Sequence, residues 1–505
     1  MRNRSWTILG LLSVAIASAA TDRASAGDWR FEVTVAPGLL TKPTDGRVLV
    51  ALGRDGEREP RQSIGNTGMA TATVLGADAD GFAPGAKVVL NSTSEIFPIE
   101  NFGKLPAGDY TVQAVFDWNP DLRMPDAPGN LYSAPQKVRI DPAAGGVVVI
   151  ELTKQIAPEK LPPDSESIKY LKFESKLLSQ FHGRPMFLRA AVVLPPGFDA
   201  SPDKRYPLLV AIGGYGTRYN QVGGWVRRVR AADALPCVIL HLDGAGPFGD
   251  PYQVNSANNG PIGDAVTQEL IPHVEKSFRC IGDPRARFTT GTSTGGWVSL
   301  ALQVLYPDFF NGCWSFAPDP VDFRAYELIN IYSDPNAYVN RFGFERPGKR
   351  LINGDTVYTV RHETQIENVL GRRNSWWLSG KDWCAWNAVF GPRGEDGKPK
   401  PLWHPKTGEI DRSVVETWKS KDLRLVLESN WKTLAPKLAG KIHIYVGDAD
   451  DYFLNNAVRL LEASAKRFDP PFDGVIQFGV MAGHGFHPVN EMKEMAERFA
   501  KTGLR

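Results

Sequence analysis

The sequence predicts an α/β protein in which a mostly parallel sheet is covered by helices on both faces, preceded by a small all-β sandwich. Residues 28–153 form short β-rich runs with turn signals between them, which is typical of a sandwich. From residue 168 onward, apolar strand-like runs alternate with helical periodicity, as in proteins built around a parallel sheet. This alternation breaks only at about 318–438, which predicts an insertion.

The composition is that of a soluble globular chain. Its 505 residues are 42% hydrophobic and 23% charged, which excludes disordered, collagen-like and coiled-coil proteins. The formal net charge is +2, and no basic block interleaves with aromatic residues, so we expect no nucleic-acid partner.

The N-terminus has the features of a cleaved secretory signal. Arg2 and Arg4 precede an apolar run at 6–20, and small residues follow at 24–26. A membrane anchor is the alternative, but the run is short against the roughly 20 residues that a spanning helix needs. We therefore expect residues 1–26 to be removed, leaving a periplasmic or secreted chain without a membrane span.

The predicted sandwich at 28–153 contains the β-rich runs "GRVLVALG", "AKVVLN", "GDYTVQAVFDW" and "GVVVIELT". The next segment, 154–167, is rich in proline and charge, which predicts a linker. The second domain then extends over 168–505. Its expected strands are 186–194, 206–212, 237–243, 287–290, 312–316, 441–446 and 475–480. Its expected helices are 263–278, 294–306, 453–468 and 489–501.

More than half of the chain's 13 tryptophans lie in the predicted insertion. They are Trp376, Trp377, Trp383, Trp386, Trp403, Trp418 and Trp431. Such side chains either pack a cap over the sheet or stack on a flat or sugar-like substrate. Both interpretations stay open. We take Trp376 and Trp377 as candidate substrate-binding residues and expect 318–438 to form a Trp-rich cap.

The stretch "TTGTSTGGW" places Ser293 between Gly291 and Gly295, each two residues away. A predicted strand precedes it and a predicted helix follows, which is the context of a nucleophile elbow. The turn is so tight that larger side chains at the two glycine positions would collide with neighbouring backbone. A purely structural glycine-rich turn is the alternative.

A catalytic serine needs a base and an orienting acid, and two later strand ends supply candidates. "KIHIYVGDADDYFL" ends a strand and offers Asp448, Asp450 and Asp451. "GVIQFGVMAGHGFHP" ends the next strand and offers His484, with His487 as the alternative. The order serine, aspartate, histidine is that of the α/β-hydrolases.

With these motifs, the chain resembles the esterase D and feruloyl-esterase branch of the α/β-hydrolases over roughly residues 168–505, apart from the insertion. The matching segments are "YPLLVAIGGYGTR", "GPIGDAVTQELIPHVEKSF", "GTSTGG", "GDADDYFL" and "AGHGFHP". The resemblance implies the α/β-hydrolase fold. It also implies Ser293 as the nucleophile, His484 as general base and acid, and Asp450 as the orienting acid, with Asp451 as the alternative.

The resemblance further implies an oxyanion hole made of backbone N–H groups near Tyr215 and at Thr294. The segment "AIGGYGTR" lacks the histidine that commonly leads this loop, but the hole uses amides rather than that side chain. We therefore expect an exported serine esterase that acts on acetylated or feruloylated saccharides. A serine peptidase and a catalytically inactive glycan-binding protein are the alternatives.

No cofactor or catalytic metal is expected. The histidines lack the H-E-x-x-H spacing, and the aspartates at 448–451 lack EF-hand spacing. The four cysteines show no C-x-x-C pairing. Cys237 and Cys313 are expected to be buried thiols, while a disulfide of Cys280 stays open because exported chains can form disulfides.

Overall fold

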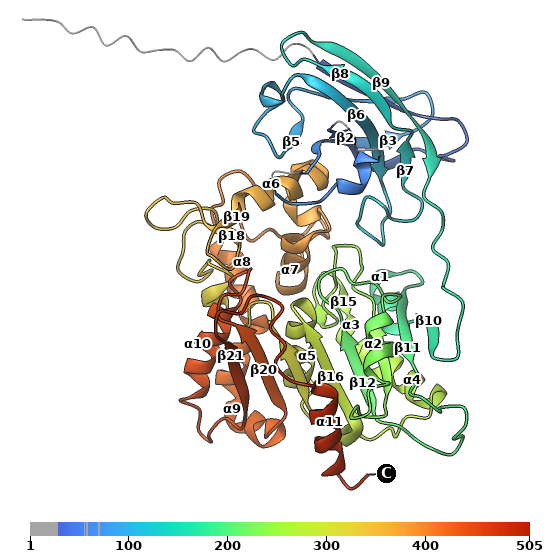
Figure 1. Ribbon diagram of the computed structural model, residues 1–505. Helices are drawn as coiled ribbons and strands as arrows, with labels where there is room; N and C mark the ends of the chain where they lie inside the picture. The colour runs from blue at the N-terminus through green and yellow to red at the C-terminus, as the bar shows by residue number, and fades with distance from the viewer. Residues whose placement is uncertain (1–28, 55, 57–58, 69–70, 505) are drawn as a thin grey trace, which may run out of the picture.

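The computed structural model describes residues 29–504, apart from 55, 57–58 and 69–70 (Figure 1). A β-rich domain lies at the top of the view, an α/β domain at the bottom, and the insertion between them. The predicted signal peptide, 1–26, lies outside the described residues. Within these bounds, no helix is both long and apolar enough to cross a membrane.

The N-terminal domain is a nine-stranded sheet. Its elements are β1 (Trp29–Val35), β2 (Thr44–Gly53), η1 (Pro60–Ser63), β3 (Thr73–Phe82), β4 (Lys87–Asn91), β5 (Glu95–Phe97), η2 (Phe102–Lys104), β6 (Gly108–Asp117), β7 (Leu131–Ser133), β8 (Gln136–Ile140) and β9 (Gly146–Gln155). The strand order is β4-β1-β9-β7-β6-β2-β3-β5, and β8 also pairs with β6.

One face of this sheet packs around a core of its own. Phe31 of β1 and Ile150 of β9 share one buried cluster with Val50 of β2 and Val112 of β6. The short strand β7 pairs with both β6 and β9, so the two halves of the expected sandwich are one continuous sheet. The alternation of buried and exposed residues along β1 and β9 is the period of two that a strand with one buried face requires.

The second domain contains an eight-stranded sheet of order β10-β11-β13-β12-β16-β17-β20-β21. The strands are β10 (Ile168–Glu174), β11 (Phe187–Val193), β12 (Leu208–Ile212), β13 (Val238–Leu242), β16 (Arg287–Thr292), β17 (Cys313–Phe316), β20 (Ile442–Gly447) and β21 (Gly474–Gly479). All neighbours pair in parallel except β10 with β11 and β11 with β13. The expected strands each appear within a few residues of their predicted bounds, and β10 is an additional edge strand.

Helices cover both faces of this sheet. They are α1 (Lys176–His182), α2 (Gly223–Arg228), α3 (Ile262–Asp264), the π-helical η3 (Ala265–Leu270), α4 (Ile271–Ser277), α5 (Thr294–Leu305), α9 (Leu423–Leu438), α10 (Asn455–Ala465) and α11 (Glu491–Ala500). The connections between them also contain the short strands β14 (Asn255–Ser256) and β15 (Gly260–Pro261) and the 3₁₀ turn η4 (Pro284–Ala286). Val298 of α5 and Leu461 of α10 belong to the core on one face, whereas Met492 of α11 belongs to the core on the other. Every residue of β12 is buried, as expected for a central strand covered on both sides.

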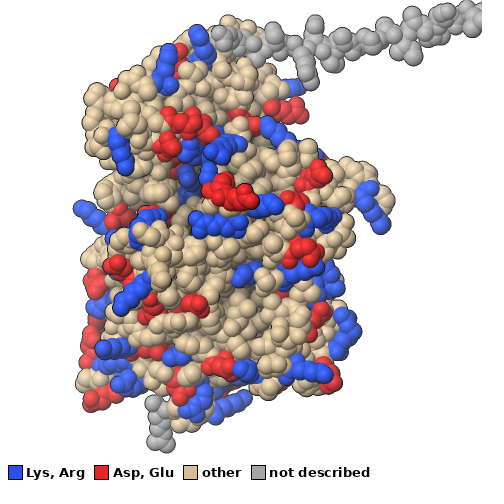
Figure 2. All heavy atoms as spheres, turned by 180° about the vertical axis from the view of Figure 1, so that it is seen from behind, with Lys and Arg blue, Asp and Glu red and all other residues tan. Residues whose placement is uncertain are grey.

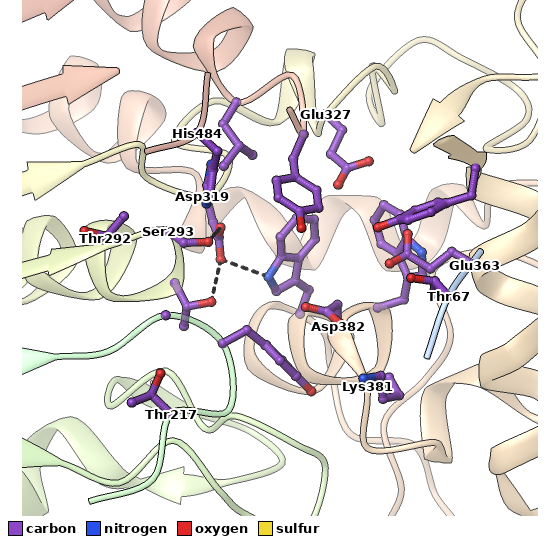
Figure 3. Close-up of a pocket in the computed structure, with 18 residues that line it drawn as sticks. Thr67, Thr217, Thr292, Ser293, Asp319, Glu327, Glu363, Lys381, Asp382 and His484 are labelled. Carbon is purple, nitrogen blue, oxygen red and sulfur yellow. Dashed lines mark hydrogen bonds between the residues drawn. The ribbon is translucent and has the colours of Figure 1, made fainter. Parts of the chain in front are cut away.

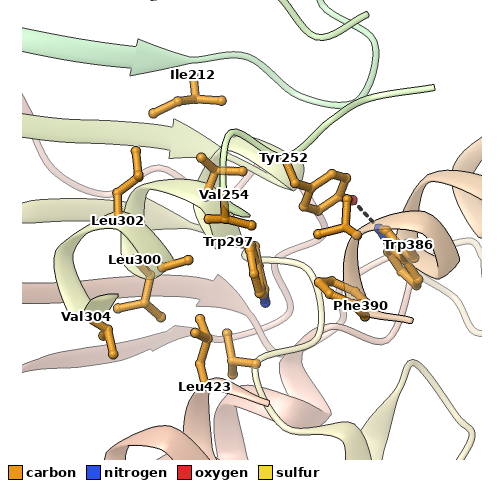
Figure 4. Close-up of a cluster of buried hydrophobic side chains, with 14 of the residues drawn as sticks. Ile212, Tyr252, Val254, Trp297, Leu300, Leu302, Val304, Trp386, Phe390 and Leu423 are labelled. Atoms are coloured by element: carbon orange, nitrogen blue, oxygen red, sulfur yellow. Dashed lines mark hydrogen bonds between the residues drawn. The ribbon is translucent and has the colours of Figure 1, made fainter. Parts of the chain in front are cut away.

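The insertion consists of short elements packed on the same core. They are η5 (Phe323–Ala325), β18 (Pro347–Arg350), β19 (Thr356–Thr359), α6 (Val360–Leu370), η6 (Arg372–Asn374), η7 (Trp376–Leu378), α7 (Asp382–Phe390), α8 (Arg412–Trp418) and η8 (Lys419–Lys421). Figure 4 shows Trp386 and Phe390 of α7 beside Trp297 of α5 and Tyr252. Helix α9 lies inside the predicted bounds 318–438, but it packs on α5 and belongs to the helices that cover the sheet. The cap-like part of the insertion therefore ends before α9.

Helix α6 joins the insertion to the N-terminal domain. Its Val369 and Leu370 share a buried cluster with Val74 and Phe97 of the β sheet. The Nε atom of Arg47, a residue only 1% exposed, donates a hydrogen bond to the Val369 carbonyl at 2.9 Å. The two parts are therefore held by both apolar packing and buried polar contacts.

The surface charges are mixed. Figure 2 shows acidic and basic side chains interspersed over the rear face, in keeping with the small net charge of +2. The four cysteines, at 237, 280, 313 and 384, are buried free thiols, so the disulfide left open for Cys280 does not form.

Candidate active site

Ser293 lies at the sharp turn between β16 and α5. Its backbone has φ +60° and ψ −123°, a conformation that residues other than glycine rarely adopt. A Cβ atom on Gly291 would overlap the backbone of Gly295, and one on Gly295 would overlap the carbonyl of Ile212. The turn therefore requires both flanking glycines, and it presents the serine hydroxyl above the carboxyl ends of the strands.

His484 and Asp450 are brought together by the loops after β21 and β20. The Nδ1 atom of His484 lies 2.8 Å from Oδ2 of Asp450. Asp450 is fully buried, and its Oδ1 accepts hydrogen bonds from the backbone N–H groups of Tyr452 and Leu454. Burial lowers the pKa of His484, but the hydrogen bond to Asp450 and the negative charges of Asp450, Asp319 and Asp451 together outweigh this and leave the pKa above its usual value.

The alternative residues are positioned differently. Asp451 Oδ1 accepts a hydrogen bond from the backbone N–H of His484 at 3.1 Å, so it holds the loop rather than the ring. The ring of His487 stacks on Phe316 at 3.7 Å and its Nε2 lies 2.9 Å from Glu491. Of the two histidines, only His484 lines the cavity that contains Ser293.

Both predicted oxyanion-hole residues, Tyr215 and Thr294, also line that cavity. Thr294 is the first residue of α5, where backbone N–H groups are free of intrahelical partners and the helix dipole favours negative charge. The phenolic OH of Tyr215 donates to the carbonyl of Gly380 at 2.9 Å. This bond ties the loop after β12 to the insertion.

Asp319, which the sequence motifs did not single out, lies directly beside the nucleophile. Among the described residues, the Ser293 hydroxyl is hydrogen-bonded to Asp319 at 3.4 Å rather than to His484. Asp319 Oδ2 accepts hydrogen bonds from Thr294 at 3.0 Å, from Trp386 at 3.3 Å and from the hydroxyl of Tyr252. Burial raises the pKa of Asp319 to about 6 despite these donors.

One signal in the sequence points to Asp319. It follows β17 by three residues, in "SFAPDP", and therefore lies at the same carboxyl edge of the parallel sheet as the other functional loops. No motif marks it, because its partners come from the insertion and from the loop that carries Tyr252.

The cavity at Ser293 has a volume of about 500 Å³ and draws its walls from three parts of the chain (Figure 3). The α/β domain supplies Ser293 and His484, the insertion supplies Trp383 and Trp386, and the N-terminal domain supplies Thr67. The contribution of Thr67 could not be read from the sequence, since it depends on how the two domains pack.

The structure corrects the expectation that Trp376 and Trp377 bind substrate, because neither residue lines this cavity. Trp376 is fully buried, stacks on Trp403 at 4.4 Å and donates its indole N–H to the Trp403 carbonyl at 3.1 Å. Trp377 packs edge-on against Trp376. Both serve the packing of the insertion, while Trp383 and Trp386 form the cavity wall.

Within the described part of the chain, no group of three or more His, Cys, Asp or Glu side chains is arranged to hold a metal ion. Around Ser293 the groups suited to acyl transfer are its own hydroxyl, the imidazole of His484 paired with the buried Asp450, and backbone amides. That set can support nucleophilic attack on a carbonyl without a metal.

A family model described as "Putative esterase" matches residues 186–469. No match was found among curated proteins. Among solved structures, a ferulic acid esterase is 14% identical, with 66% of this chain and 95% of that chain covered and a TM-score of 0.36. An S-formylglutathione hydrolase from Agrobacterium tumefaciens is 12% identical, with 68% and 95% covered and a TM-score of 0.35. The fluorophosphonate-binding serine hydrolase F of Staphylococcus aureus is 14% identical, with 67% and 97% covered and a TM-score of 0.38.

Proposed function

We propose that this chain, which belongs to the family described as "Putative esterase", is a serine esterase whose catalytic triad is Ser293, His484 and Asp450. The observation that carries the proposal is the 2.8 Å contact between His484 Nδ1 and the buried Asp450, in the wall of the cavity that holds Ser293. An imidazole held in this way keeps its proton on Nδ1 and leaves Nε2 free to act as a base.

In the proposed reaction, Ser293 Oγ attacks the ester carbonyl while His484 Nε2 takes the hydroxyl proton. The backbone N–H groups of Tyr215 and Thr294 stabilise the negative charge that develops on the carbonyl oxygen. His484 then gives its proton to the departing alcohol, which leaves an acyl group on Ser293. Water attacks this acyl-enzyme by the same route and releases the acid.

The substrate we propose is an acetyl or feruloyl ester of a saccharide. A cavity of about 500 Å³ has room for an acyl group of this size, and the rings of Trp383 and Trp386 offer apolar wall. We also propose that the enzyme is exported, which rests on the leader-like composition of residues 1–26.

A fluorophosphonate probe tests the nucleophile. The full chain should be labelled, the Ser293→Ala variant should not, and the exposed-site control Ser420→Ala should be labelled as the parent is. The same three proteins should be assayed for release of p-nitrophenol from p-nitrophenyl acetate. A folded parent protein that neither reacts with the probe nor hydrolyses the ester would support an inactive binding protein instead.

A panel of acetylated and feruloylated glycans, assayed for the released acid, then identifies the acyl group. Peptide p-nitroanilides serve as the comparison. Cleavage of these amides at rates comparable to the esters would replace the esterase proposal with a peptidase. Hydrolysis confined to esters supports it.

A further inference from the structure

The cavity wall away from Ser293 carries an excess of carboxylates. Glu327, Glu363 and Asp382 line it, and all three come from the insertion. Figure 3 shows them on the side opposite the nucleophile. Lys381 is the one lysine or arginine among the described lining residues, so carboxyl groups outnumber basic groups at this end of the cavity.

One of these carboxylates has an oxygen without a partner. Glu327 is 5% exposed, and its Oε2 is buried with no hydrogen-bond partner among the described residues. Its backbone also has φ +52°, which costs free energy in a residue other than glycine. A buried polar atom in a native protein is normally hydrogen-bonded, so the unpaired oxygen leaves Glu327 with capacity to accept a hydrogen bond from a ligand in the cavity.

The carboxylates also destabilise one another. Burial raises the pKa of Glu327 well above its usual value, and the charge of Glu363 adds to this. Burial likewise raises the pKa of Glu363, with Asp382 as the next contribution. A positive charge placed among these groups would relieve both the loss of solvation and the repulsion.

Two other ligands fit less well. A metal ion would need three or more side chains converging on one point, and the described residues contain no such group. A neutral saccharide hydroxyl would satisfy Glu327 Oε2 but would leave the repulsion among the carboxylates in place. An organic cation would both donate a hydrogen bond to Glu327 and relieve the repulsion among the carboxylates.

We propose that this end of the cavity binds a protonated amine of the substrate, with Glu327 as its direct partner and with Glu363 and Asp382 supplying further negative charge. The inference deepens the proposed esterase function and rests on it. The preferred substrates are then esters in which the acid or the alcohol carries an ammonium group, such as an ester of an amino sugar.

Aromatic rings beside the carboxylates support this assignment. Tyr358, Tyr452 and Trp383 line the same cavity, and ring faces attract cations. The Nζ atom of Lys349 lies 4.8 Å from the Tyr452 ring and donates to its hydroxyl at 3.0 Å. Lys349 therefore occupies the Tyr452 ring, which leaves Tyr358 and Trp383 as the rings for a ligand cation.

Matched substrate pairs test the proposal on each side of the scissile bond. For the alcohol side, 6-aminohexyl acetate is compared with heptyl acetate, in which a methyl group replaces the ammonium. For the acid side, p-nitrophenyl 6-aminohexanoate is compared with p-nitrophenyl heptanoate. We expect the cationic member of at least one pair to be hydrolysed with about tenfold higher kcat/KM, as close charge pairing gives.

The Glu327→Gln and Glu363→Gln variants keep the side-chain volume and remove the charge. In each variant, the ratio of kcat/KM for the cationic substrate to kcat/KM for its neutral partner should fall toward one. A general loss of catalytic efficiency would cancel in this ratio. The exposed carboxylate Glu345, which lies in the same insertion outside the cavity, provides the control Glu345→Gln, whose ratio should equal that of the parent.

The outcomes separate the two proposals. If no ester is hydrolysed by the parent protein, the esterase mechanism itself fails. If p-nitrophenyl acetate is hydrolysed but neither pair shows a preference for the cation, the amine site is overturned while the triad stands. A preference for the cationic substrate that is unchanged in both Glu327→Gln and Glu363→Gln also overturns the amine site.

Discussion

The Ser293 hydroxyl lies 3.4 Å from Oδ1 of Asp319. Through Oδ2, the same carboxylate accepts hydrogen bonds from Thr294 and from Trp386 of the insertion. It therefore links the first turn of α5, which supplies a proposed oxyanion-hole amide, to the helix that forms the opposite wall. A change at this carboxylate should affect the geometry of the nucleophile and of the insertion together.

We expect Asp319→Asn to lower kcat/KM by at least about tenfold and to destabilise the fold by about 3 kcal/mol. An amide cannot accept all the hydrogen bonds that the carboxylate accepts, and its NH₂ group would face other donors. Esterase assays and urea unfolding measure the two effects. Asp308→Asn, at an exposed position, serves as the control. If the Asp319→Asn protein had the same kcat/KM and the same free energy of unfolding as this control, the structural role of Asp319 would be refuted.

Separate substitution of the two neighbouring aspartates distinguishes the orienting acid. Asp450→Asn should lower kcat by about 10³- to 10⁴-fold, because the ring of His484 would lose the carboxylate that holds its tautomer and stabilises the imidazolium. Asp451→Asn should lower it far less, since that side chain contacts only the backbone N–H of His484. Equal losses in the two variants would contradict the assignment.

The glycine at the start of the elbow should not tolerate a methyl group. Gly291→Ala would force the new Cβ into the backbone of Gly295, and we expect a loss of about 3 kcal/mol or more in the free energy of unfolding. Gly223→Ala in α2 is the matched control, because its Cβ would meet nothing within 4 Å. Its stability should change by less than about 1 kcal/mol, as measured by thermal unfolding.

The junction between the domains should depend on Arg47. Its side chain is 1% exposed and bonds to the Val369 carbonyl, to Asp78 and to Asn374. Arg47→Ala leaves these groups unpaired, so we expect a loss of about 3 kcal/mol. Hydrogen exchange should become faster in α6. The exposed pair of Arg139 with Asp109 gives the control Arg139→Ala, which should leave α6 unchanged.

Stability should fall as the pH rises from 6.5 to 8. Burial raises the pKa of Glu367 to about 8, whereas the unfolded chain titrates near 4.5, so between these values the folded state binds the extra proton. The slope of unfolding free energy against pH is therefore negative. Burial also raises the pKa of Asp250, to about 7, which acts in the same direction. The unfolded histidines are about half protonated at pH 6.5 and about one-tenth protonated at pH 7.5, so their opposing contribution is confined to the lower end of this window.

Thermal unfolding at a series of pH values measures this slope. It should be smaller in Glu367→Gln, which has no proton to lose, and unchanged in Glu416→Gln, an exposed surface position. A parent protein whose stability rises with pH over this window would contradict the expected protonation of the buried carboxyls.

The sequence predicted best those parts of the site that short-range rules determine. The elbow at Ser293 follows from a strand, two glycines and a helix in direct succession. The rule that loops after parallel strands meet at one edge of the sheet predicts that His484 and the aspartates at 448–451 lie near Ser293, whereas the choice of Asp450 among them is what the family resemblance implies. The strand positions of the α/β domain could be predicted for the same reason, because central strands are apolar runs flanked by turns.

The remaining features depend on packing between distant segments. Trp376 and Trp383 look equivalent in the sequence, but one is stacked on Trp403 and the other faces the cavity. Helix periodicity could not separate them, since Trp376 lies in a single 3₁₀ turn rather than in α7. The partners of Asp319 likewise come from other segments, which no local pattern could indicate.

The presence of Thr67 in the cavity wall means that the N-terminal domain helps to shape the cavity in which we propose the substrate binds. Enzymes that share the same catalytic machinery could diverge in substrate range by exchanging one β-domain loop, without any change near the nucleophile. For protein engineering, that loop is a place to alter selectivity separately from turnover. Truncation to the α/β domain alone would open the cavity as well as remove its support.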